Sequence, residues 1–197
     1  MVFTGKRNDI DLDRYPAFDP DVMHSSIEIT RGCPFFCAYC SIPQLFGHRM
    51  RHRSIDVIAR YAQFLGDIRF TSPNAFAYGS DGRHPSADKI EALLKALPYK
   101  RAFFGTFPSE VRPEFINDRV LELVSKYCAN TAINSGGQSG SQSILDRIKR
   151  SHSVEDIIIG AEKCLKLCFT PVVDFIFGLP YETEEDLRKS DSGRLSS

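Results

Sequence analysis

Apolar residues in this chain fall into short strand-like runs that alternate with longer segments of helical spacing. The short runs predict strands at 26–30, 68–71, 101–106, 131–134 and 171–177. Between them, apolar residues recur every three or four positions, which predicts helices at 55–65, 90–97, 115–124, 141–148 and 153–167. Strands and helices that alternate in this way predict βα units around a parallel sheet.

Polar residues mark where several of these helices begin. Ser54 precedes the first helix, and Ser153 with Asp156 three residues later predicts an N-cap. Acidic residues after Thr183 favour the first turn of a last helix, which has barely begun where the sequence ends. We therefore expect an α/β fold, a partial TIM-like barrel of about five βα units that is truncated at its C-terminus. An irregular lead-in over residues 1–25, the barrel core over 26–189 and a disordered polar tail over 190–197 complete the predicted organisation.

The composition narrows the class of protein. Hydrophobic residues make up 42% and charged residues 25% of the chain, values typical of a globular domain. Lys plus Arg equals Asp plus Glu at 25 each, so no overall charge indicates a nucleic-acid partner. No apolar run approaches the roughly 20 residues of a membrane span. We expect a cytoplasmic protein, in which clustered cysteines indicate metal binding or catalysis rather than disulfides.

The stretch "EITRGCPFFCAYCSI" carries the strongest chemical signal. Cys33, Cys37 and Cys40 have the spacing C-x3-C-x2-C and directly follow the first predicted strand. The loops at the carboxyl ends of strands build the active site of a βα barrel, so ligands are expected here. Three thiolates suit either zinc, with His48 or His52 as a fourth ligand, or an iron–sulfur cluster. Three cysteines on a cubane cluster would leave one iron without a protein ligand.

This stretch closely resembles the cluster loop of the radical S-adenosylmethionine (SAM) superfamily, whose motif is C-x3-C-x-aromatic-C. Tyr39 fills the aromatic position. The resemblance implies a radical SAM barrel with a [4Fe–4S] cluster on Cys33, Cys37 and Cys40, whose open iron holds the amino and carboxylate groups of SAM. It further implies reductive cleavage of SAM to methionine and a 5′-deoxyadenosyl radical.

Later motifs resemble the SAM-binding segments of the same superfamily. From "GGQSGSQSILDRIKRSH" the resemblance implies that Gln138 lines the SAM ribose and that Arg150 reaches the methionyl carboxylate. From "VVDFIFGLPYETEEDL" it implies that Asp174 accepts from a ribose hydroxyl, and by position Asn74 would hold the SAM amino group. The structural alternatives are an ordinary capped helix for the first of these segments and a buried strand for the second. Ser151 and Tyr181 stand where relatives often have glycine.

Over roughly residues 11–188, with the segments "EITRGCPFFCAYC", "FGHRMRHRS", "TSPNAFAYG" and "FGTFPSEVRPEF", the chain looks like the cobalamin-binding-domain radical SAM proteins, which are related to the methylthiotransferases. This similarity implies methyl or methylthio transfer to an unidentified substrate, with cobalamin held by a domain outside this chain. We expect an electron donor such as flavodoxin or ferredoxin as partner, and no membrane or nucleic-acid partner. The alternatives are an iron–sulfur or zinc module without radical activity and a tRNA methylthiotransferase-like catalytic core. For the basic segment "GHRMRHRS" we favour a local structural or SAM-side role over RNA binding.

Overall fold

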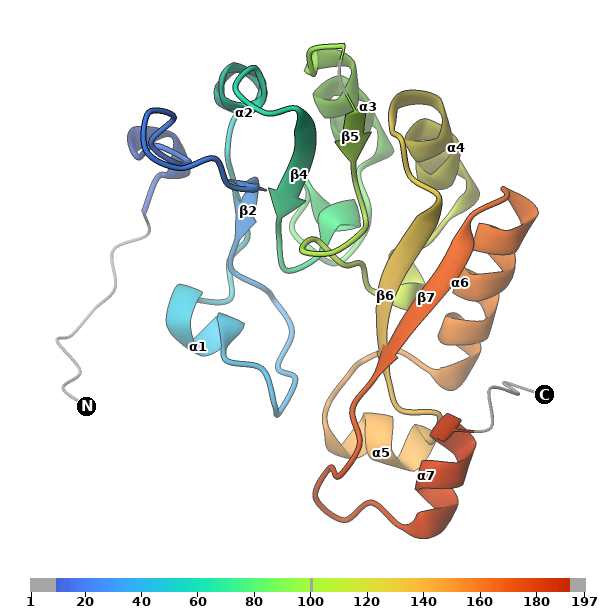
Figure 1. The fold of residues 1–197 in the computed structure, drawn as a ribbon. Coiled ribbons are helices and arrows are strands. Elements are labelled where there is room, and N and C mark those ends of the chain that lie inside the picture. The colour runs from blue at the N-terminus through green and yellow to red at the C-terminus, as the bar shows by residue number, and fades with distance from the viewer. Residues whose placement is uncertain (1–9, 100, 192–197) are drawn as a thin grey trace, which may run out of the picture.

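The computed structural model describes residues 10–99 and 101–191 and shows parallel strands that alternate with helices. Strands β1 (Ile27–Glu28), β4 (Asp67–Thr71) and β5 (Arg101–Phe103) form one parallel sheet in the order β1-β4-β5. Strands β6 (Ala132–Gln138) and β7 (Thr170–Phe175) form a second parallel pair. The strands stand side by side in Figure 1.

The chain that follows β5 joins the two sheets. The amide of Asn134 in β6 donates to the carbonyl of Gly105 over 2.9 Å, and Val111 forms a parallel bridge with Ser135. The strands thus form one curved α/β array, which confirms the predicted βα alternation. Within the described residues this array is open, and its first and last strands do not pair to close the predicted barrel.

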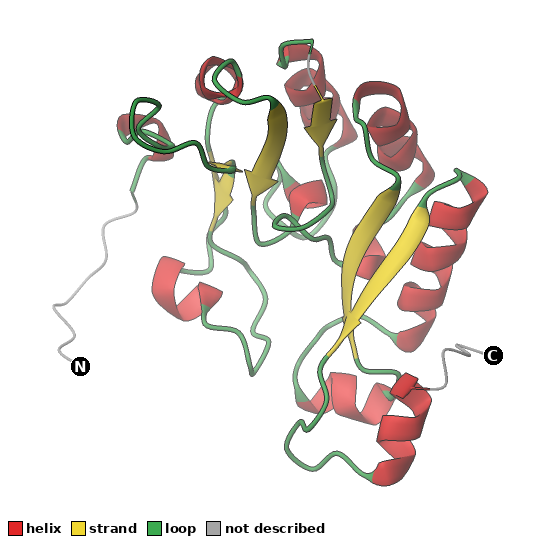
Figure 2. Cartoon of the chain, in the orientation of Figure 1, coloured by secondary structure: helices red, strands yellow, loops and turns green. Residues whose placement is uncertain are grey.

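Helices α2 (Ile55–Ala62), α3 (Ala87–Ala96), α4 (Asp118–Tyr127) and α6 (Val154–Lys166) lie along one face of the strands (Figure 2). Side-chain caps fix where they begin. Ser54 accepts from the amide of Val57 at the start of α2, and Ser153 and Asp156 form a reciprocal capping box at the start of α6. The cap predicted at Ser153 is therefore confirmed.

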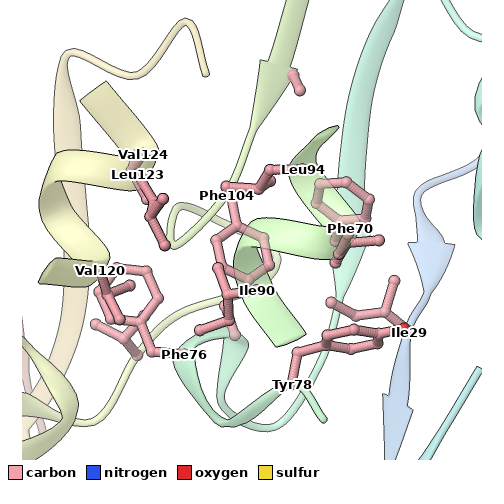
Figure 3. Close-up of a cluster of buried hydrophobic side chains, with 14 of the residues drawn as sticks. Ile29, Phe70, Phe76, Tyr78, Ile90, Leu94, Phe104, Val120, Leu123 and Val124 are labelled. Carbon is pink, nitrogen blue, oxygen red and sulfur yellow. The ribbon is translucent and has the colours of Figure 1, made fainter. Parts of the chain in front are cut away.

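The hydrophobic core fills the space between this face and the helices (Figure 3). Ile68 and Phe70 alternate along β4 with exposed or half-buried polar residues, and both are fully buried. The ring of Phe70 meets that of Phe104 edge-on, with 5.7 Å between ring centroids. Burial of each such side chain contributes about 1.5–3 kcal/mol to the free energy of folding, so this core stabilises the strands that carry the site.

Two predicted elements differ from those observed near the functional edge. The strand predicted at 26–30 divides into β1 and β2 (Thr30–Arg31), and β2 turns away to pair antiparallel with β3 (Arg51–His52). The strand predicted at 131–134 continues to Gln138, because its parallel pairing with β7 runs on to that residue. Gly136 and Gly137, which read as a break in the sequence, are needed there because neighbouring side chains leave no room for a Cβ.

One predicted helix begins later than expected. The segment after Pro113 forms a 3-10 turn, η3 (Pro113–Phe115), and α4 begins only at Asp118, with the side chain of Asn117 as its N-cap. The short elements that escaped prediction include α1 (Ile42–Phe46) and the 3-10 turn η2 (Ala75–Ala77). Both lie in loops at the carboxyl ends of strands, where apolar spacing carries little information.

The described part of the N-terminal lead-in packs against the fold. It contains one 3-10 turn, η1 (Leu12–Arg14), and Leu12 and Phe18 are buried. Arg53, which is only 2% exposed, donates through Nη1 to the carbonyl oxygens of Leu12 and Tyr15. This arginine of the basic segment therefore has a structural role, and residues 1–9 of the predicted lead-in lie outside the described residues.

The C-terminal helix α7 (Glu184–Asp191) includes Ser190 and Asp191, the first two residues of the predicted polar tail. The rest of that tail, 192–197, lies outside the described residues. Among the residues that are described, no helix has both the length and the apolar character needed to cross a membrane.

Candidate functional site

The cysteine loop is the segment between β2 and β3, and it begins at a tightly closed base. The antiparallel pairs Thr30–His52 and Arg31–Arg51 bring its two ends together, and the amide of Cys33 donates to the carbonyl of Gly47 over 3.2 Å. Gly32 has φ +90°, and a Cβ at this position would lie 2.2 Å from the carbonyl oxygen of Arg49. Only glycine fits this close approach of two backbone segments.

The far side of the loop is tied to a distant part of the chain. The amide of Ala38 donates to the carbonyl of Ile148 over 2.9 Å, directly after helix α5 (Gln142–Arg147). The loop hangs below β2 in Figure 1, on the side of the array where α5 also lies. The loop is therefore fixed at its base by neighbouring strands and along its far side by the end of α5.

The three cysteines line one cavity of about 80 Å³, together with Tyr39, Arg112 and Arg150 among other residues. Cys37 is 8% exposed, and all three carry free thiols. Burial raises the pKa of the Cys33 thiol above its ordinary value, and it outweighs the opposing effects of a hydrogen bond from the Phe35 backbone and of the Arg112 charge. The structure thus brings Tyr39 and the three predicted ligands to one place.

Arg150 reaches the cysteine loop from the segment after α5. Its Nη1 lies 3.6 Å from Cys37 Sγ, and its Nη2 donates to the carbonyl of Gly136 over 2.8 Å. A Cβ on Gly136 would lie 2.3 Å from Gln138 Nε2 and 3.0 Å from Arg150 Nη2, so the absence of a side chain there makes room for both. Two of the predicted SAM-binding residues therefore meet over a glycine of β6.

Asp174 lies on β7, one residue before the strand ends, and its side chain is exposed. The pKa of Glu110 is raised, first by burial and then by the negative charge of Asp174, while the charge of Arg150 acts in the opposite direction. The charges of Asp174 and Arg150 thus act on Glu110 from different parts of the chain. Glu110, which the loop after β5 carries, is half-buried.

Asn74 is buried at the carboxyl end of β4. Its Oδ1 accepts from the backbone amide of Arg112 over 3.4 Å, and its Nδ2 has no hydrogen-bond partner. The side-chain carbonyl of Asn74, the residue expected to hold the SAM amino group, thus already accepts a hydrogen bond from the backbone of Arg112.

Sequence reasoning missed three polar residues, the buried Arg112 and His152 and the half-buried Glu114. Arg112 Nη1 lies 3.8 Å from Cys37 Sγ, its Nε donates to Glu114 Oε1 over 2.5 Å, and its guanidinium stacks on the ring of Phe35 at 3.6 Å. Glu114 Oε2 lies 3.4 Å from His152 Nδ1. The available signal was the alternation of Glu110, Arg112 and Glu114 in "SEVRPE", which places charges at every second position of an extended segment.

A larger hollow of about 470 Å³ adjoins the cysteine loop and is lined by Ala38, Tyr39, Arg147, Ile148, Pro180 and Tyr181. The Arg147 guanidinium lies 5.5 Å from the centroid of the Tyr181 ring. Tyr181 and Ser151, the two positions where relatives often have glycine, have φ values of +68° and +61°. The backbone at both positions is left-handed, which explains why glycine suits them.

Among the described residues, no three His, Cys, Asp or Glu side chains converge closely enough to bind one metal ion. The zinc alternative with His48 or His52 required such a group. His52 is instead bonded through Nδ1 to Thr30 Oγ1 and through Nε2 to the carbonyl of Ser80, while His48 stacks on Phe36. A cubane cluster contacts each cysteine through a different iron atom, so its ligands line a cavity rather than meet at a point.

The fold and the site define an α/β protein that presents a cysteine loop and two buried arginines at the carboxyl edge of a parallel array, the edge where such folds bind cofactors. The sequence profile of the Radical SAM superfamily matches residues 27–191, most of the chain. This chain belongs to the radical SAM superfamily. Membership implies a [4Fe–4S] cluster and SAM as cofactors, as the cysteine motif predicts.

Curated relatives include enzymes named for tRNA modification. The tRNA-2-methylthio-N(6)-dimethylallyladenosine synthase of Petrotoga mobilis is 30% identical over 200 residues, which cover 95% of this chain and 44% of that protein. The threonylcarbamoyladenosine tRNA methylthiotransferase MtaB of Thermotoga maritima is 25% identical over 180 residues, which cover 86% and 40%. The chain spans less than half the length of these relatives.

Solved structures with the same fold include two cobalamin-containing enzymes. The radical SAM methyltransferase TsrM from Kitasatospora setae superposes with a TM-score of 0.67 at 19% identity, over 85% of this chain and 33% of that one. The cobalamin-dependent SAM radical enzyme OxsB superposes with a TM-score of 0.63 at 16% identity, over 84% and 25%. At these identities the likeness shows the fold, and it confirms the α/β arrangement of a radical SAM domain.

Proposed function

We propose that this chain is a radical SAM catalytic core in which Cys33, Cys37 and Cys40 hold a [4Fe–4S] cluster and SAM is cleaved reductively. The downstream reaction is methyl or methylthio transfer to a substrate still to be identified. The observation that carries the proposal is the single cavity that these cysteines share with Arg112 and Arg150 at the carboxyl edge of the strands.

The residues of this cavity suit an anionic cluster. Three cysteine thiolates are negatively charged, and two guanidinium groups stand within hydrogen-bonding reach of Cys37 Sγ to offset that charge. When bound, the cluster supplies the electron that breaks the sulfonium C5′–S bond of SAM, while the protein binds, orients and shields the reactants.

Arg150 suits the role of carboxylate ligand. Its Nη1 and Nη2 already have partners in Cys37 and Gly136, but its Nε is buried without one. A buried donor of this kind is costly until an acceptor arrives, and the SAM carboxylate is such an acceptor. Gln138 and Asp174 are the proposed ribose ligands, because Gln138 ends β6 and meets Arg150 over Gly136, and Asp174 lies near the end of the neighbouring strand β7.

Tyr39 and Asn74 complete the proposed SAM site. Tyr39 lines both the cysteine cavity and the larger hollow, and loss of water around its hydroxyl raises its pKa to about 12, so the ring stays neutral beside the cluster. The hollow, which Tyr39 and Pro180 both line, is proposed for adenine. Asn74 is proposed for the SAM amino group through the second lone pair of Oδ1.

The proposed partners follow from the chemistry. Reduction requires a one-electron donor such as flavodoxin or ferredoxin, and cobalamin is proposed as a second cofactor held by a domain outside residues 1–197. The cobalamin part of the proposal is tested separately. Cobalamin is added to the complete protein, and its visible absorbance is recorded during turnover with SAM.

One experiment tests the central claim. After anaerobic reconstitution, the wild-type protein with dithionite and SAM is expected to yield 5′-deoxyadenosine. Cys37→Ala is expected to abolish this product, while Cys168→Ala, which changes an exposed cysteine distant in sequence from the loop, retains it. Tight zinc binding without a cubane, or 5′-deoxyadenosine formation by Cys37→Ala at the wild-type rate, contradicts the proposal.

A second candidate is the catalytic core of a tRNA methylthiotransferase, and it is supported by the names of the relatives. The balanced charge of the chain and the structural use of Arg53 do not favour RNA binding. Turnover with unmodified tRNA, followed by mass spectrometry of the nucleosides, separates the candidates, because only the second predicts a methylthio-nucleoside.

A further inference from the structure

We propose that Arg112, held in place by Glu114 and His152, is a positioning residue that fixes Cys37 and makes the cluster easier to reduce. The inference rests on the proposed function, since it concerns the cluster bound by Cys37. It assigns a role to three residues for which the resemblance implies none.

The guanidinium of Arg112 is engaged on every side. Its side chain is 4% exposed, and its Nη1, Nε and Nη2 point to Cys37 Sγ, Glu114 Oε1 and the carbonyl oxygen of Arg150. The ring of Phe35, two residues before Cys37, covers one face of the group at 3.6 Å. A planar fork with three partners and a stacked ring has one orientation, so Arg112 holds its contact with Cys37 rigidly.

Glu114 and His152 anchor this fork to the sheet. Glu114 Oε2 lies 3.4 Å from His152 Nδ1, and His152 Nε2 lies 3.1 Å from the carbonyl oxygen of Gly137 in β6. Burial alone would raise the pKa of Glu114, but the nearby His152 and Arg112 bring it below its ordinary value. The carboxylate is thus ionised and pairs with Arg112, which links β6 to the cysteine loop through a chain of polar contacts.

A cation fixed beside a cluster ligand has an electronic consequence. One-electron reduction adds negative charge to the cluster and its thiolates, and an N–H donor with a positive charge near sulfur stabilises the reduced form more than the oxidised form. Water is largely excluded around Cys37, so screening of this interaction is weak. Arg112 therefore raises the reduction potential relative to a neutral residue at the same place.

A purely structural role predicts a different result. If Arg112 only filled space beneath Phe35, an apolar residue of similar length would leave the potential of an intact cluster unchanged. The measurement that separates the two roles is the midpoint potential, which does not depend on turnover.

The test is a redox titration of reconstituted protein, followed by the electron paramagnetic resonance signal of the reduced cluster. Arg112→Met is expected to make reduction at least tenfold less favourable, a shift of about 59 mV to lower potential for one electron. Arg112→Lys retains the charge without the fork and is expected to shift by less than half as much. Arg119→Met is the matched control, because Arg119 forms a surface ion pair with Glu91 on α3.

An Arg112→Met protein with a full complement of iron and sulfide that titrates like wild type overturns the inference. If Arg112→Met holds too little cluster to titrate, Arg112→Gln replaces it, because glutamine keeps a neutral N–H donor, and the same sign of shift is required. Failure of wild-type protein to hold a cubane would contradict the proposed function itself, so the two failures are distinguishable.

Discussion

Arg150 Nη1 lies 3.6 Å from Cys37 Sγ, although the two residues are 113 positions apart in the chain. The same guanidinium donates to the carbonyl of Gly136 in β6 over 2.8 Å. Arg150 therefore connects the cysteine loop to strand β6. The shape of the cysteine cavity depends on how these two distant parts of the chain pack together.

Replacement of Arg150 by methionine is expected to destabilise even the cluster-free protein. The change leaves the buried carbonyl of Gly136 without its side-chain donor, which costs about 1–3 kcal/mol. Urea denaturation followed by circular dichroism measures the effect, with the exposed Arg60→Met on α2 as control. Equal unfolding midpoints for Arg150→Met and wild type would show that the bond to Gly136 contributes nothing.

Substitution of Gly32 by alanine is expected to open the base of the cysteine loop. A positive φ costs an alanine about 1–3 kcal/mol, and contact with the carbonyl of Arg49 adds about 1–3 kcal/mol. Gly47→Ala is the matched control, because Gly47 has φ +84° and nothing within 4 Å of its Cβ position. Iron content after reconstitution and the free energy of unfolding are measured on both variants, and equal losses would contradict the predicted clash.

Ser151→Gly is expected to stabilise the protein by about 0.5–1 kcal/mol. Ser151 has φ +61°, where a side chain costs about 1–2 kcal/mol, and the greater chain entropy of glycine in the unfolded state offsets part of that gain. Ala161→Gly within α6 is the control and is expected to lose about 1 kcal/mol. Parallel urea titrations measure both, and a loss of stability in Ser151→Gly would show that the left-handed backbone carries no strain.

Asp186 is expected to make stability depend on pH in the acid range. Hydrogen bonds from Ser141 and Thr183 lower its pKa from 3.8 to about 2. The folded protein binds the proton less readily than the unfolded chain, so the stabilisation is fully present above about pH 4 and is lost as the pH falls through about 2.

The measurement is the thermal unfolding midpoint of Asp186→Asn and wild type between pH 7 and pH 2. Asp186→Asn is expected to be less stable at neutral pH, and the gap between the two proteins is expected to narrow below about pH 4. Glu162→Gln, at an exposed position of α6, serves as control. A gap of constant size across this range would rule out the predicted role of the carboxylate.

Apolar spacing was sufficient to predict the alternation of strands and helices. Burial of one face spaces apolar residues two apart in a strand and three or four apart in a helix. Apolar spacing failed where the chain departs from that rule. Gly136 and Gly137 look like a strand end, yet β6 continues through them because its pairing with β7 reaches Gln138. A Cβ on Gly137 would meet the side chain of Val173 on β7, a contact with another strand that local sequence does not reveal.

The candidate site was predictable only where its residues form a local motif. The spacing of Cys33, Cys37 and Cys40 is visible in eight consecutive residues. Arg112 and His152 lie on separate elements, and their relation to the cysteine loop arises from tertiary packing. The roles proposed for Tyr39, Gln138, Arg150 and Asp174 remain predictions, although the structure brings them to the same edge of the array.

The contacts of the cysteine loop with Ile148 and Arg150 also set an order of events during biosynthesis. At about 5–20 residues per second, a ribosome adds Arg150 roughly 6–23 s after Cys37, since 113 positions separate them. Until then the nascent thiols lack Arg150, one of the two guanidinium groups that would balance the charge of a cluster. We therefore expect cells to load this protein only after β6 and α5 have been translated, by carriers that meet the chain when it has left the ribosomal tunnel.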